Sequence, residues 1–217
     1  KTLLATAFFY HDYRLMESYA TLLGKSDDAR MFRAEAEKIK ARFNETFLDR
    51  ERGQYSNGTQ TSCVLPLAFG LVPEEFRARV FNRLVDKIEN ETHGHIGTGL
   101  VGGQYLCRVL NDNGRPDLVY TIASQKGYPG WGYMIENGAT TIWELWNGNT
   151  ADPTMNSGNH VMLIGDYVVW LYENLAGIKS DSQQPRFKHI VMNPTPVGDL
   201  TFVKATHESP YGLISSE

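Results

Sequence analysis

The sequence predicts a mainly α-helical fold that ends in a few short strands. Over residues 4–47, apolar side chains recur every three or four positions, which is the spacing of one face of an α-helix. Beyond about residue 185 the pattern changes to β-branched residues in partial alternation, separated by Asn-Pro and Gly-Asp turns. Successive helix pairs joined by irregular loops, without a fixed repeat length, favour a helical barrel over a solenoid of repeats.

The first two predicted helices form an antiparallel pair. Gly24 is placed to end the first helix, and Ser26 is a favourable residue to begin the second. The apolar stripe of the first helix comprises Leu4, Phe8, His11, Leu15, Tyr19 and Leu22. That of the second comprises Ala29, Phe32, Ala36, Ile39, Phe43 and Phe47, with charged residues on the opposite face.

Five further helices and two strands complete the prediction. The helices are expected over residues 60–69, from Pro73 to about 88, and over 100–110, 116–124 and 160–175. The last of them is apolar nearly all round, which is typical of a helix packed inside a larger body. Strands are expected over residues 187–192 and 200–206. Where this pattern changes, we place a boundary between a helical domain, residues 1–180, and the start of a second domain, residues 181–217. The second domain is expected to be unfinished, because two strands cannot build a stable sheet domain alone.

Composition excludes several classes of partner. The net charge is −4 and there is no basic run, so no nucleic-acid partner is expected. No apolar run is long enough to cross a bilayer, so no membrane partner is expected either. The chain begins at Lys1, without Met, in a segment that already reads as helix; we expect it to be cut from a longer protein, and no compartment is indicated.

No cofactor or metal ion is expected. The sequence has no phosphate-binding loop and no dinucleotide fingerprint after a strand, and neither cysteine has a metal-ligating neighbour at the usual spacing. Cys63 and Cys107 both lie in apolar helical patterns. They are interpreted as inert core thiols, with a disulfide left open as the alternative.

Residues 127–160 contain the candidate chemistry. A carboxylate, Glu144, stands between Trp143 and Trp146. Indole faces match the C–H faces of a sugar ring, and partial burial against apolar rings favours proton transfer by a carboxylate. Lys and Arg are absent from residues 127–160, so Glu144 has no cation nearby in the sequence to pair with. This favours a catalytic role over that of an ordinary surface carboxylate.

Several other residues are candidates for binding a substrate. His160 follows an Asn-Ser-Gly-Asn run, and a neutral imidazole there can both donate to and accept from sugar hydroxyls. Trp131, Tyr133, Trp143 and Trp146 are candidates for stacking on a sugar, and core packing is an equally good interpretation of each. Gln60 could line the same cavity or could cap the helix that it begins.

These motifs resemble one known family. Residues 139–144, Ala-Thr-Thr-Ile-Trp-Glu, followed by residues 156–160, Asn-Ser-Gly-Asn-His, resemble the bacterial α-L-rhamnosidases, the six-hairpin glycosidases of family 78. The resemblance continues through residues 7–10, 57–62, 69–73, 97–99, 128–133 and 208–212. It therefore covers nearly the whole chain.

The resemblance implies a fold and a mechanism. The fold is an (α/α)6 barrel, of which this chain supplies the later helices, followed by the opening strands of a C-terminal β-sandwich. The mechanism is inverting and releases terminal α-L-rhamnose, with Glu144 in the place of the general base and His160 in that of a substrate-binding histidine. Leu145 and Asn147 depart from the basic and acidic residues often found at those positions. The general acid is expected before Lys1, so the isolated chain is expected to be inactive.

Two other functions stay open. One is another carbohydrate-active enzyme with an (α/α)6 barrel, such as a glucan or uronide hydrolase or lyase, although a uronide site would need Arg or Lys among the aromatic residues. The other is a non-catalytic, carbohydrate-binding helical fragment. An incomplete barrel would also leave apolar helix faces exposed, so self-association is expected to be possible.

Overall fold

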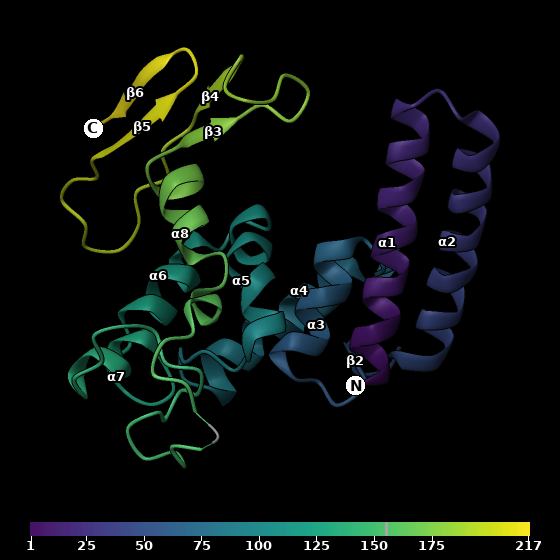
Figure 1. Ribbon diagram of the computed structural model, residues 1–217. Helices are drawn as coiled ribbons and strands as arrows, with labels where there is room; N and C mark the ends of the chain where they lie inside the picture. Colours follow the sequence, from purple (N-terminus) through teal and green to yellow (C-terminus); the bar gives the residue numbers. More distant parts are fainter. Residues whose placement is uncertain (155) are drawn as a thin grey trace. The chain divides into compact units, whose positions relative to one another are not determined.

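The computed structural model describes residues 1–154 and 156–217, which form two compact units, residues 1–91 and 92–217. The first unit contains α1 (Thr2–Leu22), α2 (Ser26–Phe47), β1 (Leu48–Asp49), β2 (Gln54–Tyr55), α3 (Gln60–Phe69), α4 (Glu74–Asp86) and a π-helical turn, η1 (Lys87–Glu91) (Figure 1). The second contains α5 (Leu100–Asp112), α6 (Pro116–Ser124), α7 (Trp131–Glu136), the 3-10 turn η2 (Val161–Ile164), α8 (Tyr167–Trp170), the π-helical turn η3 (Leu171–Leu175), β3 (Ile178–Ser180), β4 (Ile190–Met192), β5 (Ala205–Ser209) and β6 (Gly212–Ser216). None of the described helices is long and apolar enough to cross a membrane.

The helices α1 and α2 lie side by side and antiparallel (Figure 1). Gly24 adopts φ 70° in the turn between them, a conformation that glycine allows without strain. Glu17 is buried on α1, and Arg33 on α2 donates a hydrogen bond of 2.6 Å from Nε to its Oε1. The predicted bounds of this helix pair are confirmed.

The buried face of α1 is displaced from the predicted stripe. The buried residues of α1 are Leu3, Ala7, Tyr10, Glu17 and Ala20. Tyr19 and Leu22, which belong to the predicted stripe, are exposed. The cause is that α1 has two neighbours: besides α2, it contacts α3, where His11 stacks on Phe69 with ring centroids 4.3 Å apart.

A buried polar network joins α2 to the β1–β2 hairpin. Leu48 pairs with Tyr55 and Asp49 with Gln54 in this antiparallel hairpin, which the sequence did not predict. The Tyr55 hydroxyl donates to Oδ1 of Asn44, whose Nδ2 donates to Leu71 O at 2.9 Å. Because every one of these groups is buried, the network stabilises the first unit only while it is complete.

The amphipathic pattern after Pro73 is confirmed as α4. Its apolar side chains Val80 and Leu84 are fully buried, as is Ile88 in the π-helical turn that follows. The two cysteines lie one in each unit, buried and without a disulfide, and burial raises the pKa of both thiols. These positions support the interpretation of Cys63 and Cys107 as two core thiols.

The segment predicted as one helix over residues 160–175 is interrupted. It forms η2, α8 and η3 in succession, with a break at Gly165, which adopts φ 62°. A Cβ added at Gly165 would lie 2.2 Å from the carbonyl oxygen of Gly103 in α5, so only glycine allows this close approach. The next residue, Asp166, is buried and its carboxylate binds backbone N–H groups of α5.

The C-terminal segment forms two separate antiparallel hairpins among the described residues. In one, β3 pairs with β4 in the register Ile178 with Met192; in the other, β5 pairs with β6 in the register Ala205 with Ser216. Strands were predicted over residues 187–192 and 200–206. β4 lies within the first range, whereas β5 overlaps the second only at residues 205 and 206 and continues to Ser209, and β3 and β6 were not predicted. Ser216 Oγ donates to Ala176 O at 2.7 Å and so ties β6 to the end of the last helical turn. The domain boundary between residues 180 and 181 stays a prediction.

Candidate active site

Two backbone segments of the second unit pair around Glu144. The N–H of Glu144 donates to Ser157 O at 2.9 Å, and the N–H of His160 donates to Ile142 O at 2.6 Å. The hydroxyl of Thr141 also donates to Gly158 O. Two main-chain hydrogen bonds and one side-chain hydrogen bond therefore hold residues 141–144 against residues 157–160.

This pairing brings the Glu144 carboxylate next to His160. Oε2 of Glu144 accepts a hydrogen bond of 2.9 Å from the N–H of Ser157 and lies 4.0 Å from Nδ1 of His160. The Glu144 side chain is 41% exposed and that of His160 is 24% exposed. The partial burial against apolar rings that the sequence predicted for Glu144 is therefore not found: the side chain is exposed. The carboxylate keeps one fixed donor and is open to water, so it can reach a proton of a water molecule.

Trp131 and Trp146 belong to a cluster of aromatic rings that also includes Tyr167, and Trp131 is its buried member. Trp131 begins α7 with 7% of its surface exposed, and its ring stacks on Tyr167 with centroids 5.1 Å apart. Its Nε1–H donates to Leu163 O at 3.2 Å. Trp146 meets Trp131 edge-on at 5.8 Å and donates from Nε1 to Thr98 O at 3.0 Å. Trp131 is therefore well placed to hold Trp146.

Trp143 and Tyr133 are half-buried and nearer the surface. The ring of Trp143 packs over Gly148, where an added Cβ would lie 2.7 Å from the ring. The Tyr133 hydroxyl donates to Asn149 Oδ1 at 3.1 Å, and its ring meets Tyr128 edge-on at 5.4 Å. The hydroxyl of Tyr133 is thus engaged within its own unit.

Gln60, the remaining candidate, lies in the first unit. It is the first residue of α3 and is 1% exposed. The cap of this helix is Thr59, whose Oγ1 accepts a hydrogen bond of 3.3 Å from the N–H of Ser62. Capping therefore falls to Thr59.

Comparison with known proteins places this chain in a family. The family model described as the bacterial α-L-rhamnosidase 6 hairpin glycosidase domain matches residues 1–175, and that of the bacterial α-L-rhamnosidase C-terminal domain matches residues 177–217. The chain belongs to the bacterial α-L-rhamnosidase family. The resemblance found in the sequence is confirmed, and so is the fold class: a mainly α chain that forms part of a six-hairpin, (α/α)6 domain, with a few strands at its C-terminal end.

Individual relatives agree. An α-L-rhamnosidase of Formosa agariphila is 36% identical over 220 residues, covering 99% of this chain and 23% of the relative. One of Streptomyces avermitilis is 35% identical over 221 residues, covering 100% of this chain and 21% of the relative. The chain therefore spans about a fifth to a quarter of the length of the curated α-L-rhamnosidases that it matches.

Solved α-L-rhamnosidase structures share the fold. The crystal structure of the Streptomyces avermitilis α-L-rhamnosidase complexed with L-rhamnose superposes with a TM-score of 0.90 at 35% identity, covering 98% of this chain and 20% of that one. The native enzyme from Aspergillus terreus superposes with a TM-score of 0.88 at 29% identity, covering 96% of this chain and 24% of that one.

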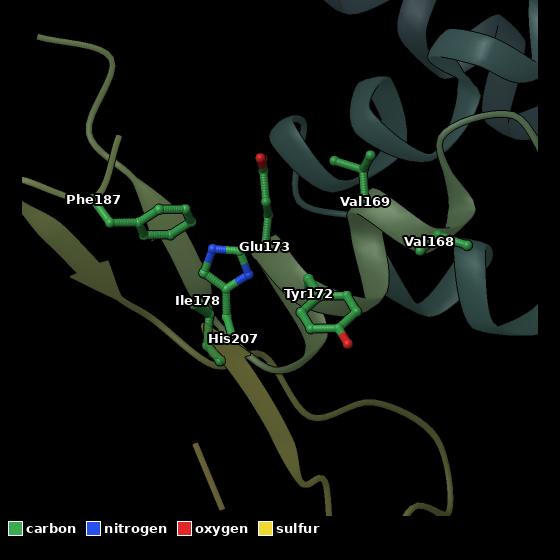
Figure 2. Close-up of a pocket in the computed structure, with 7 residues that line it drawn as sticks. All are labelled: Val168, Val169, Tyr172, Glu173, Ile178, Phe187 and His207. Atoms are coloured by element: carbon green, nitrogen blue, oxygen red, sulfur yellow. The ribbon is translucent and has the colours of Figure 1, made fainter. Parts of the chain in front are cut away.

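The second unit of this α-L-rhamnosidase-family chain has an apolar pocket that Glu144 does not line. It has a volume of about 250 Å³ and lies between α8–η3 and the C-terminal strands (Figure 2). Its lining is mostly apolar and comprises Val168, Val169, Tyr172, Glu173, Ile178, Phe187 and His207. Figure 2 shows the imidazole of His207 next to the ring of Phe187, and their centroids are 4.3 Å apart. None of the candidate residues predicted from the sequence lines this pocket.

Within residues 1–154 and 156–217, no group of three or more His, Cys, Asp or Glu side chains is arranged to hold a metal ion. The geometry adds three residues that the sequence did not single out individually. Ser157 and Asn156 bind the Glu144 segment, and Thr98 accepts the Trp146 N–H. The motifs Asn-Ser-Gly-Asn and Gly-Thr-Gly that contain them were the available signal, because short polar residues beside glycine often bind backbone groups.

Proposed function

We propose that this chain supplies the water-activating half of the active site of an inverting α-L-rhamnosidase, with Glu144 as the general base. The observation that carries the proposal is the carboxylate of Glu144, which is open to water and oriented by the Ser157 N–H beside His160. A base must reach the proton that it removes, and a fixed, accessible oxygen meets this requirement.

The reaction needs a second carboxyl group. In an inverting glycosidase, one carboxylic acid protonates the leaving oxygen while the other carboxylate deprotonates water on the opposite face of the sugar, and the two stand about 6.5–9.5 Å apart. We assign the second role to Glu144 and the first to a residue outside residues 1–217. The chain matches only 21–23% of the length of two curated relatives, which supports assigning the acid to a residue outside residues 1–217.

The substrate is proposed to be a terminal α-L-rhamnosyl group on a glycan or glycoside. The complex of the Streptomyces avermitilis relative with L-rhamnose supports a carbohydrate ligand of this kind. In the proposed site, His160 bonds a sugar hydroxyl, while Trp143, Trp146 and Tyr133 offer ring faces to the sugar. Trp131 supports Trp146 from the core, and a substrate-binding role for Gln60 stays a prediction from the sequence.

The isolated chain is proposed to self-associate. Tyr19 and Leu22 are apolar residues on one helix with 55% and 84% of their surface exposed, and Phe9 on the same helix is 52% exposed. Exposed apolar patches of this kind mark surfaces that other protein segments cover. Dilution of the isolated chain followed by light scattering tests this, and a monomer at every concentration would contradict it.

The decisive test replaces Glu144 in a protein of the length of the relatives that contains this chain. Glu144→Gln should lower kcat on an aryl α-L-rhamnoside by about 100-fold or more, which is the usual share of general-base catalysis. Glu136→Gln is the matched control, because Glu136 lies in the same unit and pairs at 3.0 Å with Lys126. Turnover within a few-fold of wild type in Glu144→Gln would favour a non-catalytic, carbohydrate-binding role.

Two further measurements separate the parts of the proposal. The first sugar anomer released, followed by NMR, should have the configuration opposite to that of the substrate; retention would exclude an inverting mechanism. Residues 1–217 alone should give no turnover, because the leaving group stays unprotonated without the acid. Strong turnover by the isolated chain would show that the acid lies within it.

A further inference from the structure

Asn156 has no role in the proposed reaction, but its side chain contacts the turn that follows Glu144. Its side chain is half-buried. Its Oδ1 accepts a hydrogen bond of 3.1 Å from the N–H of Leu145, the residue directly after Glu144. Its Nδ2 lies 3.4 Å from Gly148 O and donates to it. One amide group therefore contacts both ends of the turn that follows the candidate base.

This turn is short and closely packed. The N–H of Gly148 donates to Leu145 O at 3.0 Å and so closes it. Gly148 lies against the ring of Trp143, where a larger residue would collide with the indole. A shift of the turn therefore moves the residues on both sides of Glu144, because Trp143 precedes Glu144 and Leu145 follows it.

Asn156 and Ser157 act on Glu144 from the same side. The backbone of Ser157 binds Glu144 twice, once through the main chain and once through Oε2, each at 2.9 Å. Asn156 precedes Ser157, and its side-chain oxygen accepts a hydrogen bond from the N–H of Leu145, the residue after Glu144. Without the Asn156 side chain, the main chain after Glu144 loses the acceptor that aligns Leu145 with this segment, and the carboxylate can turn away from its donor.

We infer that Asn156 is a positioning residue that fixes Oε2 of Glu144 relative to His160 and to the attacking water. This inference rests on the proposed role of Glu144 as the general base. Catalysis by a base depends steeply on geometry, and a displacement of about 1 Å can lower a rate by about 100-fold. A residue that acts only through the base should change kcat and leave substrate binding in place.

The test is a double-mutant cycle in a protein of the length of the relatives that contains this chain. Asn156→Ala should lower kcat on an aryl α-L-rhamnoside by about 10- to 100-fold, with KM within about threefold of wild type. In the Glu144→Gln background, where there is no base to position, the same change should lower kcat by less than about threefold. Asn156→Ser removes the same two contacts and leaves a polar group; it is measured in parallel and replaces Asn156→Ala if that variant does not fold.

The control is Asn113→Ala. Asn113 lies in the same unit, and its Nδ2 donates to Val109 O at 2.7 Å at the end of α5. This variant should lose a side-chain hydrogen bond and some thermal stability but keep wild-type kcat. An equal fall of kcat in both Asn→Ala variants would assign the effect to general destabilisation and overturn the inference.

The remaining outcomes distinguish this inference from the proposed function. A raised KM with wild-type kcat would make Asn156 a substrate contact and overturn the positioning role. Additive losses in the double variant would show that Asn156 acts independently of Glu144 and overturn it as well. Wild-type turnover in Glu144→Gln alone would overturn the proposed function, and the inference with it.

Discussion

The buried carboxylate of Asp166 accepts a hydrogen bond of 3.2 Å from the backbone N–H of Cys107, in the middle of α5. It also accepts one of 3.0 Å from the N–H of Arg108. Through these bonds, the chain just after the Gly165 break is fixed to α5, and the start of α8 is fixed with it.

Asp166→Ala should therefore destabilise the second unit. The change leaves two N–H groups without their buried acceptor and should lower the free energy of unfolding by about 2 kcal/mol or more, as measured by urea denaturation. Asp152→Ala is the control, because Asp152 also accepts a backbone N–H, that of Thr154 at 2.9 Å, but on the surface. A loss no larger than that of the control would show that the bonds to α5 contribute little.

The stability contributed by Asp166 should depend on pH. Burial raises the pKa of its carboxyl above the ordinary value of 3.8, while the backbone donors of Arg108 and Cys107 act in the opposite direction. A group whose pKa is raised on folding contributes stability that is complete below the unfolded pKa and is lost as pH rises through the folded one. The unfolding free energy of wild type minus that of Asp166→Asn should thus fall as the pH rises above the ordinary carboxyl pKa. A difference that stays constant or rises would contradict the assignment.

Gly165→Ala should be among the most destabilising single changes in the second unit. The new Cβ would lie 2.2 Å from Gly103 O, at a residue that already has φ 62°. We expect a loss of about 3 kcal/mol or more in the free energy of unfolding. Gly138→Ala has the same kind of positive φ, 81°, with no atom within 4 Å of the added Cβ, so it should lose only about 1 kcal/mol. Equal losses of unfolding free energy in the two variants would show that the close contact between residue 165 and Gly103 does not destabilise Gly165→Ala.

His160→Ala should weaken substrate binding more than the chemical step. If His160 bonds a sugar hydroxyl, KM on an aryl α-L-rhamnoside should rise and kcat/KM should fall about 10-fold or more. His189→Ala is the control: His189 lies in the same unit and contacts a carboxylate, Asp181, at 2.8 Å, outside the active-site segments. Unchanged kinetics in His160→Ala would remove His160 from the proposed site.

Tyr55→Phe should destabilise the first unit without changing its packing volume. The variant removes the hydroxyl that donates to Asn44 Oδ1 and leaves this buried acceptor unsatisfied, at a cost of about 1–3 kcal/mol. Tyr13→Phe provides the comparison, because Tyr13 packs its ring against Phe9 and Phe32. An equal loss in the two variants, measured by urea unfolding, would argue against the buried network.

Much of the helical framework could be predicted from sequence, because its ends are determined locally. The bounds of α3 and α6 follow from Pro116, which favours a helix start, and from the Gly70 that follows α3. The break at Gly165 could not be predicted in this way. It depends on a close approach to Gly103, some 60 positions earlier, and hydrophobic periodicity carries no information about such contacts.

In the candidate site, too, residues with a local sequence signal could be predicted and long-range contacts could not. Glu144 and His160 were chosen for their residue types and local setting, and the structure places them 4.0 Å apart; their roles stay predictions. The donor that orients the carboxylate could not be predicted, because it is the backbone N–H of Ser157, which every residue except proline has. Only the pairing of the two segments makes this particular N–H relevant.

The two C-terminal hairpins have a consequence for handling the protein. A sheet of two strands consists entirely of edge strands, whose outer N–H and C=O groups can pair with another chain. In β4 this edge carries Ile190, Val191 and Met192, three consecutive exposed apolar residues without a charge among them. Residues 1–217 prepared alone should consequently form β-rich aggregates on warming, starting from this strand, and a lysine in place of Val191 should delay them.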